Sequence, residues 1–69
     1  MTNKEFLDRI GIEFRVARTR QRLSIREISN MTGLDNNTIG KIERGQSEAK
    51  ILTYKRIADA LGVELKTFL

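Results

Sequence analysis

The sequence has no cysteine, histidine, proline or tryptophan among its 69 residues. Without cysteine or histidine the chain can form neither a disulfide nor a zinc finger, and it lacks the thiol and imidazole groups of common hydrolase sites. A chain of this length also fits only one small domain, residues 1–69, with little room for a substrate cavity. We therefore predict a non-enzymatic domain with no metal site and no cofactor.

Long hydrophobic runs are also missing, because no more than two apolar residues stand together, as in Ile51-Leu52. This argues against a transmembrane helix and a secretory signal, and with the absence of cysteine it predicts a cytoplasmic protein with no membrane partner. Basic residues are in excess, with 13 Lys and Arg against 9 Asp and Glu and a net charge of +4. Such a balance favours a nucleic-acid or other anionic partner.

Two capping boxes of the form S/T-x-x-E predict the starts of the first two helices. The first box, residues 2–5, begins a helix that runs to about Arg22. The second, residues 24–27, begins a shorter helix whose last apolar contact is Met31. Gly33 follows, where a chain reversal after a helix requires a positive φ.

Two more helices and a final turn are predicted in the second half of the chain. Asp35 is a favourable N-cap for a helix over residues 36–44. The next helix begins between residues 47 and 50 and ends at Leu61, and residues 64–69 form a last helical turn. Three apolar side chains of that turn are expected to close the core, to form a dimer interface, or to do both: Leu65, Phe68 and Leu69.

Apolar residues three or four positions apart give each predicted helix one side suited to burial. Four side chains on these sides are predicted core residues: Phe6, Phe14, Ile51 and Tyr54. Five arginines fall between residues 15 and 26 with no acidic residue among them. This basic stretch is either a solvated face or a set of phosphate contacts.

Two short capped helices joined by Thr32-Gly33-Leu34 are typical of a helix-turn-helix. The chain combines this motif with Leu23-Ser24, Glu27-Ile28, Gly33-Leu34, Thr38-Ile39, Lys41 to Gly45 (KIERG) and Ile57 to Val63 (IADALGV). With these segments it resembles the lambda-repressor-like (Cro/C1, or XRE) family of DNA-binding domains over nearly its whole length. The resemblance implies an all-α, five-helix domain with the helix-turn-helix at its second and third helices. It also implies a homodimer on double-stranded DNA with the third helix in the major groove.

Individual roles follow from matching this sequence to the family pattern. The base-facing positions of the third helix are Asn36, Asn37, Gly40 and Lys41. Asparagine can pair with adenine and lysine can donate to guanine, which suits these positions to base reading. The expected phosphate contacts are Arg22, Ile25 through its backbone amide, Arg26, Thr38 and Arg44. The pair Arg18 and Glu43 is expected to be structural, holding the third helix in register.

Two departures from the family pattern bear on function. Ile25 stands where the family usually has glutamine, so a side-chain contact to phosphate is lost there. Gly40 stands where serine is common, at a cost of roughly 1 kcal/mol inside a helix. The missing side chain either permits a close approach to a thymine methyl or the DNA backbone, or it is a tolerated change.

The leading hypothesis is a sequence-specific transcription regulator, a repressor that binds a two-fold operator as a homodimer. The alternative is a protein-interaction module of the same fold, an antitoxin or adaptor with an unknown protein partner, and it is supported by Ile25 and Gly40. Membrane-surface binding through the first helix is a third hypothesis, which Asp8 and Glu13 oppose. An enzyme is the least favoured class.

Overall fold

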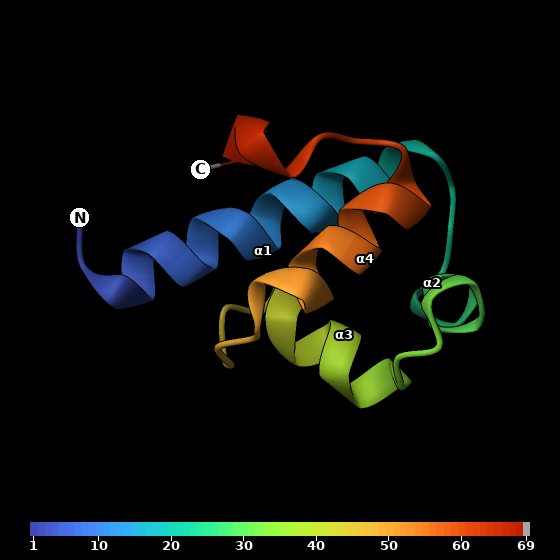
Figure 1. Cartoon of the computed structure of the whole chain (residues 1–69), viewed down its shortest axis with the longest axis horizontal. Helices are drawn as coiled ribbons and strands as arrows, with labels where there is room; N and C mark the ends of the chain where they lie inside the picture. Colours follow the sequence, from blue (N-terminus) through green and yellow to red (C-terminus); the bar gives the residue numbers. More distant parts are fainter. Residues whose placement is uncertain (69) are drawn as a thin grey trace.

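A computed structural model describes residues 1–68, which fold into four α-helices and a terminal 3-10 turn (Figure 1). The elements are α1 (Asn3–Arg20), α2 (Ile25–Thr32), α3 (Asn36–Glu43), α4 (Ile51–Leu61) and η1 (Leu65–Phe68). No strand occurs within the described residues, so the predicted all-α class is confirmed. The expected count of five helices is reached only if η1 is included. None of the helices in residues 1–68 has the length and hydropathy needed to cross a bilayer.

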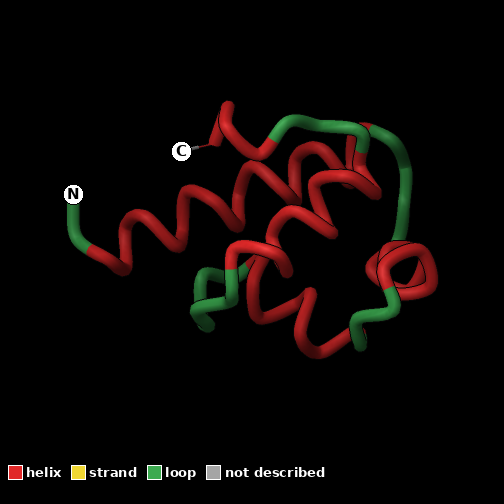
Figure 2. The backbone as a smooth tube through the Cα atoms, in the orientation of Figure 1, coloured by secondary structure: helices red, strands yellow, loops and turns green. Residues whose placement is uncertain are grey.

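The long helix α1 organises the molecule, because α3, α4 and η1 all contact it. Figure 2 shows α2 nearly end-on while α1 and α4 run across the view, so α2 crosses them steeply. The N-terminus and η1 lie at the same end of the molecule (Figure 1). This arrangement leaves α3 on the opposite side from η1, with its outer surface free of other helices.

Hydrogen bonds at the helix starts agree with the sequence patterns. The hydroxyls of Thr2 and Ser24 accept hydrogen bonds from the amides of Glu5 and Glu27 at 3.1 and 3.0 Å. Each glutamate carboxylate accepts a hydrogen bond from the amide of its cap residue in turn. The start of α4 differs, because Lys50 occupies its N-cap without a side-chain hydrogen bond. Because Asp35 caps α3 as well, three of the four helices have a side-chain cap at the N-terminus, and α4 depends on packing instead.

The core is built around Phe14, which is fully buried. Its ring lies 6.2 Å from the ring of Tyr54 on α4 and 5.2 Å from that of Phe68 in η1, the latter edge to face. Such aromatic pairs stabilise beyond the area they bury. The terminal turn thus closes the core of the protomer. The other buried apolar residues are Ile10, Ile28, Ile39, Ile42, Ile57, Ala58 and Leu61.

The predicted end of the first helix is two residues too late, because α1 ends at Arg20. Arg22 has a positive φ of 58°, and its amide donates to the carbonyl of Thr19 while the amide of Leu23 donates to that of Arg18. These bonds form the left-handed turn that usually carries glycine after a helix. The turn reverses the chain so that α2 can begin at Ile25.

Three residues predicted to pack inward are instead exposed. Phe6 is 39% exposed because the first turns of α1 extend beyond the shorter helices that pack on it (Figure 1). Met31 is 55% exposed, since α2 buries Ile28 and Thr32 on its other side. Ile51 is 57% exposed at the first residue of α4. In each case the residue is near a helix end, where neighbouring helices give less cover.

Candidate nucleic-acid interface

The helix α3 has one buried side and one polar side. Ile39 and Ile42 are buried against the core. The opposite side exposes two amides, an ammonium group and a guanidinium group, from Asn36, Asn37, Lys41 and Arg44. Such donors match the acceptors that base pairs present in the major groove.

The turn before α3 is held by hydrogen bonds from short polar side chains. The Thr32 hydroxyl donates to the carbonyl of Ile28 at 2.7 Å and accepts the amide of Leu34 at 3.1 Å. The Ser29 hydroxyl donates to the carbonyl of Leu34. Gly33, with φ of 78°, makes the reversal at the end of α2. These bonds fix the angle at which α3 leaves the turn.

The first turn of α3 is capped by a carboxylate. Asp35 accepts the amide of Thr38 at 2.7 Å. That backbone hydrogen bond lowers the pKa of Asp35 below its ordinary value, because it favours the ionised form. The cap is thus negatively charged at neutral pH, the sign that the amino end of a helix stabilises.

The structure brings Arg18 and Glu43 together in a two-pronged ion pair. The Nε of Arg18 donates to Oε2 of Glu43 at 2.8 Å and its Nη2 donates to Oε1 at 2.9 Å, while Nη1 donates to the carbonyl of Leu23 at 2.8 Å. The Glu43 side chain is only 7% exposed. The hydrogen bond to Glu43 raises the pKa of Arg18. One guanidinium thus links the ends of α1 and α3 and the start of the helix-turn-helix.

Gly11 and Gly45 allow α1 to touch the carboxyl end of α3, a contact that the sequence patterns did not predict. A Cβ at Gly11 would lie 2.5 Å from the carbonyl oxygens of Ile42 and Glu43. Gly45 has φ of 67°, and a Cβ there would overlap Asp8. A glycine inside the amphipathic pattern of the first helix is the signal that could have revealed this approach.

The expected phosphate contacts come from α2, from α3 and from the residues that follow α1 and α3. Arg22, Arg26 and Arg44 are exposed, while Ile25 and Thr38 are half-buried. Ile25 is the first residue of α2, where the helix has no acceptor of its own for the amide hydrogen. The residues expected to contact DNA thus come from two adjacent helices and the segments that follow α1 and α3.

A shallow hollow lies between α2 and α3 on this surface. It is lined by Ile25, Asn36, Asn37, Gly40 and Arg44. Gly40 is buried in the free protein although it is on the same side of α3 as the exposed polar residues. Arg44 covers it, as described below.

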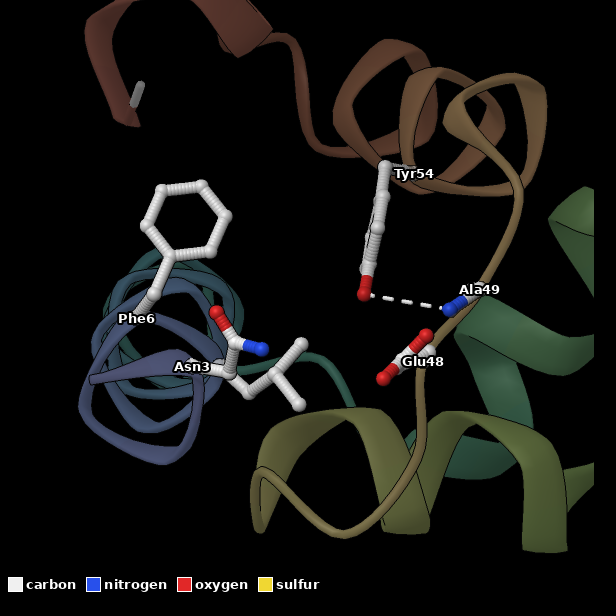
Figure 3. Close-up of a pocket in the computed structure, with 6 residues that line it drawn as sticks. Asn3, Phe6, Glu48, Ala49 and Tyr54 are labelled. Atoms are coloured by element: carbon white, nitrogen blue, oxygen red, sulfur yellow. Dashed lines mark hydrogen bonds between the residues drawn. The ribbon is translucent and has the colours of Figure 1, made fainter.

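A separate pocket lies under the amino end of α1 (Figure 3). Phe6 and Asn3 of α1 face Tyr54, whose hydroxyl accepts the amide of Ala49 at 3.2 Å. Glu48 and Leu7 complete the lining. None of the residues expected to contact DNA lines this pocket. The hydrogen bond instead steadies the loop that precedes α4.

The residues expected at a dimer interface have different environments. Phe68 is buried in the core of its own protomer, Leu65 is half-buried, and Leu69 lies outside the described residues. Next to Leu65 is an apolar groove that begins with the exposed Ile51 and Leu52 of α4. Its lining continues through Lys55, Asp59, Val63, Glu64 and Lys66. The expected apolar surface is therefore larger than the terminal turn and includes α4.

Comparison with known proteins agrees with this geometry. A family model described as helix-turn-helix, of the Cro/C1 (XRE) type, matches residues 14–68. The crystal structure of the restriction-modification controller protein C.AhdI from Aeromonas hydrophila superposes with a TM-score of 0.85. It has 30% sequence identity, and the match covers 91% of this chain and 96% of that chain. No curated protein matches the sequence.

Proposed function

The chain belongs to the Cro/C1-type helix-turn-helix family of DNA-binding transcription regulators, and from that premise we propose that it is a repressor of a two-fold operator. One observation carries the proposal: α3 exposes only polar, mostly donor side chains on one side, while both of its ends are fixed. A fixed helix can enter the major groove at a defined angle. Its similarity to a restriction-modification controller protein favours DNA binding over a protein-adaptor role.

In the proposed complex, residues on α3 read bases and residues around it contact phosphates. Asn36 and Asn37 pair with adenine and Lys41 donates to guanine. Arg22, Arg26, Thr38 and the amide of Ile25 contact phosphates and set the position of α3 in the groove. The exposed amides of α3 are thus assigned to adenine and its exposed ammonium group to guanine.

The proposed operator has two half-sites because one short helix reads too few base pairs to specify a unique site in a genome. We propose that two protomers associate through the groove along α4 and η1. Its floor is apolar, from Ile51, Leu52 and Leu65, and its rim carries charges of both signs from Lys55 and Asp59. A surface with both charges can face a second copy of itself across a two-fold axis.

The test is a titration of the protein against a duplex obtained by selection from random sequences and against a scrambled duplex, each at two salt concentrations. The higher salt matters because counterion release alone gives any basic domain an apparent affinity. We expect about 1,000-fold tighter binding to the selected duplex, with two protomers per site. Equal binding to both duplexes, lost at the higher salt, would reject the proposal.

Two matched variants separate the proposed roles. Lys41→Ala should relax the preference at one base position and leave the others unchanged. Arg26→Ala should weaken binding to all sequences alike and reduce the salt dependence by about one phosphate contact. An identical effect of both variants across sequences would mean that the division between base and phosphate contacts is wrong.

A further inference from the structure

Gly40 is the one residue on the outer side of α3 that is buried. The atoms that cover it belong to Arg44, one turn later. A Cβ built on Gly40 would lie 3.0 Å from Nη1 of Arg44, 3.6 Å from Nη2 and 3.7 Å from Cζ. The guanidinium of Arg44 therefore occupies the space that a side chain at position 40 would take.

The direction of the Arg44 side chain follows from helix geometry. Side chains in an α-helix lean toward the amino end, so a long one covers the turn before its own Cα. A second contact holds the guanidinium, because Nε of Arg44 donates to Oε1 of Gln46 at 3.1 Å. With Nε engaged, the two Nη groups remain as the donors that lie over Gly40.

We propose that Gly40 is a positioning residue that seats the Arg44 guanidinium among the base-facing residues of α3, where Arg44 reads a guanine. The inference rests on the proposed function. It replaces the phosphate contact that the family pattern implies for Arg44. Leaning back by one turn, about 5.4 Å, brings its charge over Gly40 in the hollow that Asn36 and Asn37 also line, toward the part of a recognition helix that contacts base edges.

Guanine is the base that this geometry favours. The two Nη groups of an arginine present a planar pair of donors, which matches O6 and N7 of guanine in the major groove. Nothing bulkier than a hydrogen stands at position 40, so the planar group can lie flat over the helix. In this chain Arg44 supplies the side chain that Gly40 lacks.

The experiment uses the selected operator with each guanine replaced in turn by 7-deazaguanine, which has no N7. We expect wild-type protein to lose about tenfold in affinity at each of two guanines per half-site, one read by Lys41 and the other by Arg44. The guanine read by Arg44 is the one whose replacement still weakens binding of Lys41→Ala. Arg44→Lys keeps the charge but not the planar pair of donors, so it should lose the sensitivity to that substitution. Its salt dependence should stay that of the wild type.

Gly40→Leu tests whether the space over residue 40 positions Arg44. Leucine favours helices and fills this space with a group that cannot donate a hydrogen bond. It should lose the sensitivity at the same guanine although Arg44 is still present. In an Arg44→Lys background, Gly40→Leu should have no further effect on sensitivity. Thermal unfolding of each variant separates a loss of base reading from a loss of fold.

Two results would overturn the inference. If Arg44→Lys keeps the full effect of 7-deazaguanine at every position, Arg44 does not read a guanine, although the chain still binds its operator. If Gly40→Leu weakens all sequences alike, and equally with or without Arg44, glycine is needed for backbone approach rather than as a seat. Failure to select any operator would reject the proposed function as well.

Discussion

The two ends of α3 are held by different kinds of contact. At the amino end, the side chains of Ser29, Thr32 and Asp35 form hydrogen bonds with the backbone of the turn and of the first turn of α3. At the carboxyl end, the backbone lies directly against α1 at Gly11, and Glu43 pairs with Arg18.

These two kinds of contact should fail in different ways. A hydrogen bond can lengthen, or be replaced by water, at a net cost of about 1 kcal/mol. A backbone contact with no space for a methyl group cannot adjust in this way. Relieving the overlap requires the two close-packed helices to move apart. The carboxyl end of α3 should therefore be the less tolerant of substitution.

The largest effect is expected from Gly11→Ala, which tests that intolerance. The added Cβ would lie 2.5 Å from two backbone carbonyl oxygens, so α1 and α3 must separate. We expect about 3 kcal/mol less stability, measured by urea unfolding. Gly40→Ala is the matched control, because it is also a glycine inside a helix but its Cβ meets only the flexible end of Arg44. Alanine should stabilise there by up to ~1 kcal/mol, and equal losses in the two variants would refute the comparison.

The next largest effect is expected from Glu43→Gln, which leaves Arg18 without its charged partner. Removing one member of a well-buried pair costs about 3 to 5 kcal/mol, and partial exposure of this pair reduces the expected loss to about 2 kcal/mol. Operator affinity should fall with it, because α3 is no longer held to α1. Lys4→Gln is a suitable control, since its pair with Asp8 is largely exposed and should contribute below ~1 kcal/mol. A similar loss in both variants would remove any special role for the buried pair.

A change in the turn that follows α1 provides a reference for these losses. Arg22 holds a left-handed conformation with φ of 58°, which is unfavourable for any residue but glycine. Arg22→Gly should raise the free energy of unfolding by about 1 kcal/mol, while weakening DNA binding equally for all sequences. If stability falls instead, the side chain of Arg22 has a structural role that outweighs the relief of backbone strain.

The smallest effect is expected at the amino end of α3 and depends on pH. The pKa of Asp35 is lowered in the folded state, so its contribution to stability is complete above the pKa of an unfolded aspartate. It is lost as the pH falls through the lower, folded pKa. Asp35→Asn keeps a side-chain cap without a titrating group, and its melting temperature should fall less than that of the wild type on acidification. If the melting temperatures of the wild type and Asp35→Asn fall equally between neutral and acidic pH, Asp35 has no such role.

The amino end of α3 was largely predictable from sequence, whereas the carboxyl end was not. Capping and turn residues act within four positions along the chain, so Ser24, Gly33 and Asp35 could be identified from spacing alone. The contact at Gly11 joins residues about thirty positions apart, so a glycine inside the first helix can indicate a close approach but not which segment makes it. The pairing of Arg18 with Glu43 was expected only because the family has it.

The outer side of α3 shows a second limit of sequence reasoning. The exposure of Asn37 and Lys41 follows from helical periodicity, but the burial of Gly40 does not. Burial there depends on the direction of one long side chain and on the bond from Arg44 to Gln46. Exposure of Phe6 and Ile51 was missed for a related reason, because periodicity gives a residue's side of the helix and not how far the neighbouring helix extends.

Phe68 packs edge to face against Phe14, so η1 is ordered within a single protomer. In the proposed dimer, Leu65 therefore meets its counterpart on a surface that is already assembled. Association loses little conformational entropy under these conditions, and its heat-capacity change reflects the area covered rather than the folding of a segment. The fraction of dimer then follows protein concentration by simple mass action, with no folding step coupled to the association of two folded protomers.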